Sequence, residues 1–279
     1  SLTDHGSALE AYITNSDGKD MEYSEELISA FLDEVIEKKP HVLVLTGDLT
    51  YGGEKKSHVD LINKLKNVED AGIHVCVIPG NHDMYSGTAV SFAGDSYTRV
   101  DSITSEEFSS MYGSFGFDEA LSRDTDSLSY VYQCAPSTRL LFVDVNASAM
   151  YNRVSDTTLE WIEEQLKQAE EDHARIIAFS HQSMLKQTVF STGYVIANGS
   201  DLEKLYEQYG VIANFSGHLH IQHTKTGDHN IPEAITSSLA VSPNQYAEIT
   251  LSSTALDYQT RSTDVSAWAL SNHSDNPDL

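Results

Sequence analysis

Four short apolar segments constrain the fold of this chain, because each ends directly in a glycine or in a side chain that can bind a metal. The segments cover residues 42–46, 75–79, 175–180 and 211–216. Continuous apolar runs of this length are typical of strands that are covered on both faces. Amphipathic helical patterns at 24–38 and 57–71 precede the first two segments. An alternation of helices and buried strands predicts a layered α/β fold.

Three later helices are predicted from capping boxes, in which Ser or Thr is followed three residues later by Glu. The pairs are Thr104 with Glu107, Thr157 with Glu160, and Ser200 with Glu203. Further strands are expected at 128–133, 139–145, 234–241, 245–252 and 256–260. No linker divides the chain, so we expect residues 1–279 to form one domain, with a polar C-terminal extension at 262–279.

Charge and cysteine content exclude several classes of protein. The 279 residues include 42 acidic and 17 basic side chains, which give a formal net charge of −25. A chain this acidic is not expected to bind nucleic acid or anionic membranes through its bulk field. No apolar run approaches the ~18 residues of a membrane span. Cys76 and Cys134 are too few for a disulfide framework and too far apart for a zinc–thiolate site, so we expect buried free thiols.

The residues that follow the four apolar segments form the candidate site. They are Gly47-Asp48, Gly80-Asn81-His82-Asp83, His181 and Gly217-His218-Leu219-His220. Sites assemble at the carboxyl ends of strands in open α/β sheets, so we expect these side chains to converge. Carboxylate, amide and imidazole ligands suit Mn, Fe or Zn, whereas calcium takes only oxygen. The i, i+2 spacing of His218 and His220 would place both rings on one side of an extended segment.

In this order the motifs resemble those of calcineurin-like metallophosphoesterases, over residues 47–220. The resemblance implies an α/β (α+β) fold, a four-layer αββα sandwich of two mixed β-sheets flanked by helices. Three segments are also similar to a bacterial subgroup of cyclic-nucleotide-phosphodiesterase-like proteins. These segments are 47–55, 126–130 and 258–268.

The resemblance implies a centre of two divalent metal ions. Asp48 would bridge both ions, and Asn81, His181 and His218 would complete the first. His220 would bind the second ion, together with an Asp-x-His pair from the end of the family's first strand. Two such ions lower the pKa of a bridging water, so hydroxide would attack phosphorus without a Ser or Cys nucleophile.

Two further residues would assist at the substrate, according to the same resemblance. His82 would contact the phosphoryl group, as an electrophile or as an acid toward the leaving oxygen. Asp83 would hold the ring of His82 in orientation. The local positive charge of the metals would let an acidic protein bind a small phosphate ester.

The first motif of the family is missing from the sequence. No buried strand that ends in Asp-x-His precedes the helix at 24–38. Asp4 and His5 are adjacent and would point to opposite faces of an extended chain, so we expect them to be loop residues. The simplest interpretation is that the sequence starts downstream of the first strand, which would leave one metal site weak or empty.

These observations together predict a metal-dependent phosphodiesterase, with cyclic nucleotides as candidate substrates. Two alternatives stay open, a phosphomonoesterase that acts on small phosphates and a metal-binding domain without catalytic activity. The metal identity, the oligomeric state and the cellular compartment are left open as well. The histidines outside the motifs, His58 and His74 among them, are expected at the surface.

Overall fold

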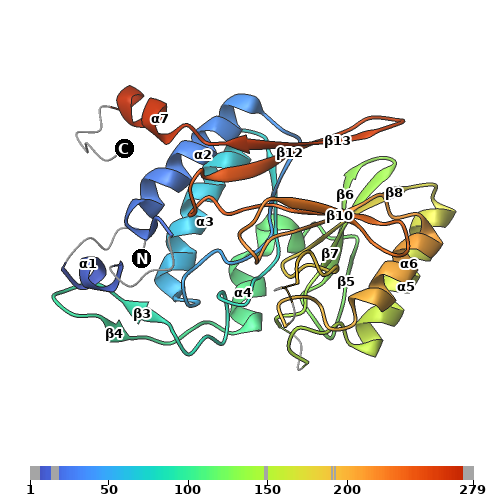
Figure 1. The fold of residues 1–279 in the computed structure, drawn as a ribbon, viewed down its shortest axis with the longest axis horizontal. Coiled ribbons are helices and arrows are strands. Elements are labelled where there is room, and N and C mark those ends of the chain that lie inside the picture. The colour runs from blue at the N-terminus through green and yellow to red at the C-terminus, as the bar shows by residue number, and fades with distance from the viewer. Residues whose placement is uncertain (1–6, 14–18, 148–149, 190, 192, 273–279) are drawn as a thin grey trace.

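The computed structural model describes residues 7–272, apart from 14–18, 148–149, 190 and 192. Asp4 and His5, which we expected in a loop, lie outside the described residues. Figure 1 shows helices on two sides of a central body of strands. None of the helices in this part of the chain is both long and apolar enough to cross a membrane.

A seven-stranded mixed sheet is the centre of the fold. Its strands lie in the order β10-β11-β9-β8-β7-β6-β5. They are β5 (Ser122–Arg123), β6 (Tyr130–Ala135), β7 (Thr138–Val143), β8 (Arg175–Ser180), β9 (Asn214–Ser216), β10 (His223–Thr226) and β11 (Pro232–Ile235). The four central strands, β11, β9, β8 and β7, run parallel. At one edge β10 pairs antiparallel with β11, and at the other β6 pairs antiparallel with β7 and β5 antiparallel with β6.

The central strands alternate their side chains between two cores. Leu141 of β7 packs in a cluster with helices α5 (Asp156–Glu171) and α6 (Gly199–Tyr209), whereas the next residue, Phe142, packs in the core on the opposite face. This period of two is the pattern of a strand that is covered on both sides, as its apolar sequence predicts.

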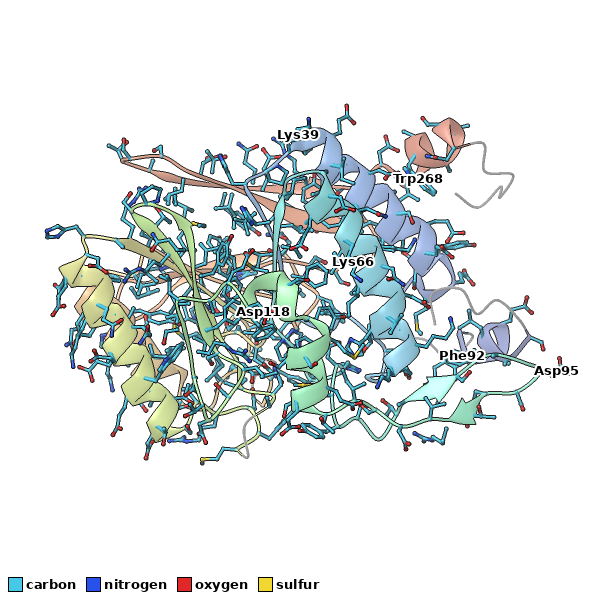
Figure 2. The ribbon with its side chains drawn as sticks, turned by 180° about the vertical axis from the view of Figure 1, so that it is seen from behind. Lys39, Lys66, Phe92, Asp95, Asp118 and Trp268 are labelled. Atoms are coloured by element: carbon cyan, nitrogen blue, oxygen red, sulfur yellow. The ribbon has the colours of Figure 1, made fainter. Side chains whose placement is uncertain are left out.

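A smaller layer covers the second face of the large sheet. Its strands are β1 (Val42–Leu45), β2 (His74–Val77), β12 (Gln245–Leu251) and β13 (Leu256–Ser262). Helices α2 (Ser24–Lys38) and α3 (Lys55–Asp70) contribute to the same core. Lys39, which caps the end of α2, has a left-handed backbone (Figure 2). The order of layers is helices, large sheet, small strands and helices.

The expectation of two mixed sheets is correct for the large sheet and wrong for the second layer. That layer consists of a parallel pair, β1 with β2, and a separate antiparallel pair, β12 with β13. Within the described part of the chain, no strand joins the two pairs into one sheet.

The remaining elements are short. They are α1 (Ser7–Ile13), η1 (Met21–Tyr23), β3 (Val90–Ser91), β4 (Thr98–Arg99), α4 (Ser105–Met111), η2 (Gly113–Phe117) and α7 (Val265–Ser271). The polar extension at 262–279 thus contains a helix, and the indole N–H of Trp268 on α7 donates to Asp33 on α2 (Figure 2). Cys76 is buried and Cys134 is half-buried, and both are free thiols as expected.

One predicted capping box is confirmed and two are wrong. Thr104 and Glu107 form the reciprocal box at the start of α4. Helix α5 is capped by Ser155, two residues before the expected Thr157, and α6 starts without a side-chain cap. The helix therefore begins two residues earlier than the expected box, within the range over which local sequence leaves helix ends uncertain.

Candidate metal centre

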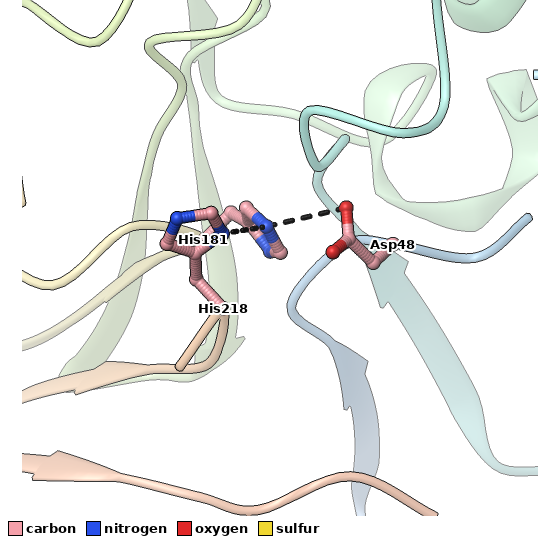
Figure 3. Close-up of side chains that lie close together, drawn as sticks. All are labelled: Asp48, His181 and His218. Carbon is pink, nitrogen blue, oxygen red and sulfur yellow. Dashed lines mark hydrogen bonds and ion pairs between the residues drawn. The ribbon is translucent and has the colours of Figure 1, made fainter. Parts of the chain in front are cut away.

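The predicted ligands lie on four loops, each at the carboxyl end of a strand. Asp48 follows β1, Asn81 follows β2, His181 follows β8 and His218 follows β9. Figure 3 shows Asp48 opposite the two imidazoles, so that the small layer and the large sheet each contribute ligands. Side chains more than 100 residues apart in sequence therefore meet at the junction of two layers.

Two glycines let the loops after β1 and β2 approach closely. Gly47 has a φ of +92°, and a Cβ at this position would lie 2.5 Å from the main-chain nitrogen of Gly80. A Cβ at Gly80 would in turn collide with the carboxylate of Asp48. Asp48 and His218 also have positive φ angles, 53° and 65°. Such backbones carry a conformational cost outside glycine, so surrounding contacts must hold these loops in place.

The Nε2 atom of His181 is the centre of the ligand group. It lies 3.2 Å from Asp48 Oδ1, 3.1 Å from Asn81 Oδ1 and 3.2 Å from His218 Nδ1. Ligand atoms on a tetrahedral ion with bonds of about 2.0–2.1 Å lie about 3.3 Å apart. The observed separations therefore match adjacent positions on one metal ion.

A main-chain contact selects the tautomer of His181. Its Nδ1 lies 2.7 Å from the carbonyl oxygen of Thr46. A carbonyl only accepts hydrogen bonds, so Nδ1 carries a hydrogen, and Nε2, which faces the oxygens of Asp48 and Asn81, is the nitrogen that can hold either a proton or a metal ion. Electron-rich atoms that face one another in this way are stabilised by a cation, so the donor set fits a divalent metal.

The charge states of Asp48 and His218 suit metal binding, whereas a proton competes with a metal ion at His181. Burial raises the pKa of the Asp48 carboxyl, but the facing imidazole of His181 more than offsets this effect and the pKa lies below its ordinary value. Burial likewise lowers the pKa of His181, but the Asp48 carboxylate outweighs it and the pKa is raised. Burial and the proximity of His181 lower the pKa of His218 to about 4, so this ring is neutral at pH 7, the state in which an imidazole can bind a metal ion.

His220 directly follows a tight turn at 217–219, which corrects the expectation of an extended segment. The main-chain N–H of Leu219 donates to Gly217, and both His218 and His220 have positive φ angles, 65° and 52°. Alternation along a strand therefore does not decide where the two rings point. Among the described residues, the group with ligand atoms within 4.8 Å of one another consists of Asp48, His181 and His218, without His220.

His82 is oriented by the main chain. Its Nδ1 lies 2.8 Å from the carbonyl oxygen of Tyr51, so Nδ1–H donates and Nε2 is the nitrogen that can exchange a proton. The main-chain N–H of His82 donates to Asp48 Oδ1 over 3.1 Å. His82 thus positions the carboxylate of Asp48, a candidate metal ligand, through its backbone and independently of its ring.

Asp83 contacts two loops and not the ring of His82, which corrects the role that we expected for it. Its carboxylate accepts from the main-chain N–H groups of Gly80 and Thr50, at 2.7 and 2.9 Å, and from the Thr50 hydroxyl at 3.1 Å. Asp83 thereby ties the loop after β1 to the loop after β2. Burial and the nearby charge of Asp48 raise the pKa of Asp83 to about 7.

His58 is fully buried, although the sequence analysis placed it at the surface. Its Nε2 lies 3.0 Å from the carbonyl oxygen of Asp83, and its Nδ1 lies 2.9 Å from the hydroxyl of Tyr112. The sequence does indicate this burial, because His58 precedes Leu61 and Leu65 by three and seven residues, which is the spacing of the apolar face of α3. His58 supports the loop after β2 from behind.

We expect His58 to make stability depend on pH. Burial lowers its pKa to about 4, whereas an unfolded chain has an ordinary value of about 6.5. Between these values the unfolded state binds the proton more readily, so the free energy of unfolding falls as the pH falls. The contribution of His58 alone is a loss of about 2 kcal/mol from pH 7 to pH 5.

Denaturant unfolding of the wild type and of His58→Gln at both pH values measures this contribution. The variant should lose clearly less stability on acidification than the wild type. The exposed His74 provides the matched control, since His74→Gln should keep the wild-type pH dependence. Equal pH dependence in wild type and His58→Gln would contradict the prediction.

Comparisons with known proteins give the family of the chain. A family model described as calcineurin-like phosphoesterase matches residues 13–222. No curated protein sequence matches the chain.

Two solved structures share the fold. A dimetal phosphatase from Danio rerio is 13% identical with a TM-score of 0.66, over 88% of each chain. A purple acid phosphatase from yellow lupin (Lupinus luteus) seeds is 16% identical with a TM-score of 0.58, over 84% of this chain and 46% of the lupin chain. At these identities the structures demonstrate a common fold, and the family model covers most of the sequence. The chain therefore belongs to the calcineurin-like phosphoesterase family.

Proposed function

We propose that this protein hydrolyses phosphate esters with the help of divalent metal ions, and that phosphodiesters are its preferred substrates. The observation that carries the proposal is the convergence of Asp48, Asn81 and His218 on the Nε2 atom of His181, at 3.1–3.2 Å. Membership of the phosphoesterase family supplies the reaction class. The preference for diesters, with cyclic nucleotides as candidates, rests on the subgroup resemblance of residues 126–130 and 258–268.

The metal ions would be held unequally. Asp48, Asn81, His181 and His218 would hold the first ion, because their ligand atoms are already close together. We propose Asp48 and His220 for a second ion, which two protein ligands would bind weakly, since catalytic ions ordinarily have three. When bound, such ions activate water and neutralise charge on the phosphoryl oxygens.

His82 is the residue that we propose as the contact to the phosphoryl group. Because its Nδ1–H is held by Tyr51, Nε2 remains for the substrate. A protonated ring can donate from Nε2 to the leaving oxygen, and a proton positioned in this way speeds ester cleavage. Asp83 would hold the loops after β1 and β2 together by accepting hydrogen bonds from their main-chain N–H groups, and it would not touch the substrate.

The strongly negative bulk charge favours a small substrate. With a net charge of −25, the chain repels extended polyanions at long range. A small phosphate ester experiences mainly the local field of the metal ions once it is in the site. We therefore propose a small phosphate ester as the substrate, and no nucleic acid of extended length.

Hydrolysis of two chromogenic esters tests the proposal. With Mn²⁺ present, we expect the protein to cleave bis(p-nitrophenyl) phosphate faster than p-nitrophenyl phosphate, and excess chelator should abolish both reactions. Faster cleavage of the monoester would favour the phosphomonoesterase alternative. Tight Mn²⁺ binding without turnover of either ester would favour a metal-binding domain without catalytic activity.

A further inference from the structure

One exposed aromatic ring lies directly beside the candidate metal centre. The ring of Tyr194 contacts the imidazole of His218, with 5.8 Å between the ring centroids and an angle of 42° between the planes. Tyr194 nevertheless keeps 55% of its surface exposed. The phenol ring thus borders a candidate metal ligand, while much of its surface stays open to a molecule that enters the site.

The backbone around Tyr194 is held by buried partners. The side-chain amide of Asn152 donates to the carbonyl oxygens of Val195 and Gly193, at 2.7 and 3.4 Å, and so holds the residues on both sides of the tyrosine. The main-chain N–H of Tyr194 donates to the carbonyl oxygen of Ser191 over 3.0 Å. Asn152 and Ser191 are both buried. A single exposed tyrosine needs no explanation by itself, but these contacts present this ring in a fixed place.

Two main-chain contacts tie the same segment to the end of strand β8. The N–H of Ile196 donates to the carbonyl oxygen of Ser183 over 2.9 Å, and Ser183 forms a parallel bridge with Val195. Ser183 follows the candidate ligand His181 by two residues. The end of β8 therefore positions both a candidate metal ligand and the exposed ring of Tyr194.

Tyr194 and His82 border the ligand group from different sides. The main chain of His82 donates to Asp48, whereas the ring of Tyr194 contacts His218, and Figure 3 shows Asp48 and His218 on opposite sides of the group. A phosphodiester carries two alcohol groups on one phosphorus atom. The proposed function places the leaving oxygen beside His82, so the alcohol group that stays on phosphorus would lie toward Tyr194.

The chemistry of the ring favours a flat aromatic group as its partner. Aromatic rings attract one another at centroid distances of about 4.5–7 Å by more than their buried area explains. Nucleobases stack on tyrosine in this way, whatever their hydrogen-bonding pattern, because every base has a flat π-face. A saturated alcohol group offers no such face, and the phenol offers no cationic group for an additional phosphate.

We propose that Tyr194 is a specificity-determining residue, on which a flat aromatic group in the retained alcohol of a phosphodiester stacks. A nucleobase is one such group. The inference rests on the proposed function and deepens it, since it names the part of the substrate that the site recognises beyond the phosphoryl group. The ring would contribute to substrate binding and take no part in breaking the ester bond, so its removal should raise the KM for aromatic substrates selectively.

Two diesters that share the p-nitrophenolate leaving group test this role, one with phenyl and one with methyl as the retained group. For the full chain with Mn²⁺, we expect a KM about tenfold lower for the phenyl ester, because stacking of one ring contributes about this factor. Tyr194→Ala should reduce the preference to about twofold or less, and Tyr194→Phe should retain it because the ring is kept.

Tyr97→Ala is the matched control. Tyr97 is 53% exposed but contacts Tyr12 and no candidate ligand, and it directly precedes β4, which Figure 1 shows away from the large sheet. This variant should keep the wild-type preference for the phenyl ester. If both esters are cleaved and the preference is absent from the wild type or survives Tyr194→Ala, the role of Tyr194 is overturned while the proposed hydrolysis stands.

Binding of phenylphosphonate and methylphosphonate gives a readout that needs no turnover. Calorimetry on the Mn²⁺-loaded protein should show about tenfold tighter binding of phenylphosphonate, and Tyr194→Ala should lose this difference. If neither ester is cleaved, the proposed function fails and the binding measurement decides alone. A phenyl preference that disappears in Tyr194→Ala then supports the stacking role, whereas equal affinities, or no binding of either phosphonate, would overturn it.

Discussion

Replacing His181 by alanine is expected to abolish metal binding and, with it, phosphoesterase activity. Its Nε2 is the atom around which the other three ligand atoms gather at 3.1–3.2 Å. Loss of a residue that merely orients a metal ligand lowers affinity by about 10–100-fold, so loss of this ligand should exceed about 100-fold. Metal analysis after loading with Mn²⁺ and desalting measures the effect.

Metal analysis also tests whether the two metal sites differ in their affinity for the ion. We expect the wild type to retain one strongly held ion and His181→Ala to retain none, while circular dichroism reports an intact fold in both. His74→Ala is the matched control, since His74 is exposed and remote from the ligands, and it should keep full metal content. Retention of metal by His181→Ala would refute the ligand assignment, and two fully occupied ions in the wild type would refute a weak second site.

The convergence of Asp48, Asn81, His181 and His218 could be predicted from the sequence, and the reason is physical. Each residue directly follows an apolar run long enough for one buried strand, and the carboxyl ends of such strands meet. The ligands can be located because they follow the ends of strands, and the ends of buried strands can be recognised from the local sequence. The match of the family model to residues 13–222 agrees with this interpretation.

Features that depend on backbone dihedral angles, or on contacts between loops that are distant in sequence, could not be predicted. The positive φ angles of His218 and His220 are imposed by the turn that leaves β9, and no local signal distinguishes them from extended residues. The carboxylate of Asp83 lies beneath two loops that are distant in sequence, so its partner Thr50 is a tertiary contact. The burial of His58 does follow a local signal, because its spacing from Leu61 and Leu65 places it on the apolar face of α3.

The order of the strands in the large sheet could not be predicted from the sequence either. In the large sheet, β6, β7, β8, β9 and β11 overlap segments that were expected to be strands, whereas β5 and β10 were not expected. The strand order, in which β11 lies between β9 and β10, follows from contacts that only the folded chain makes. The continuous apolar sequence of β1 predicted cover on both faces, and the structure shows that cover to be incomplete. The apolar sequence of β1 therefore predicts more burial than the described residues provide.

Replacing His82 by alanine should slow ester hydrolysis by about 10²–10⁴-fold and leave the metal content unchanged, since a positioned acid or base contributes about this much to the rate. The ring of His82 lies outside the ligand group of Asp48, His181 and His218. The contact of His82 with Asp48 uses the main-chain N–H, which alanine retains. Turnover per bound metal therefore reports on the ring alone, with His74→Ala again as the unaffected control.

The choice of leaving group distinguishes the two roles considered for His82. An acid that protonates the leaving oxygen matters little when the leaving group is p-nitrophenolate, which departs readily without a proton, and matters greatly when it is an alkoxide. If His82 is the acid, His82→Ala should therefore lose far more activity on an alkyl ester than on a p-nitrophenyl ester. If the ring instead stabilises charge on the phosphoryl oxygens, the two losses should be similar, because those oxygens are common to both substrates. Undiminished turnover on both esters would show that His82 has no chemical role, and the ring would then serve only to pack against the loop of Tyr51.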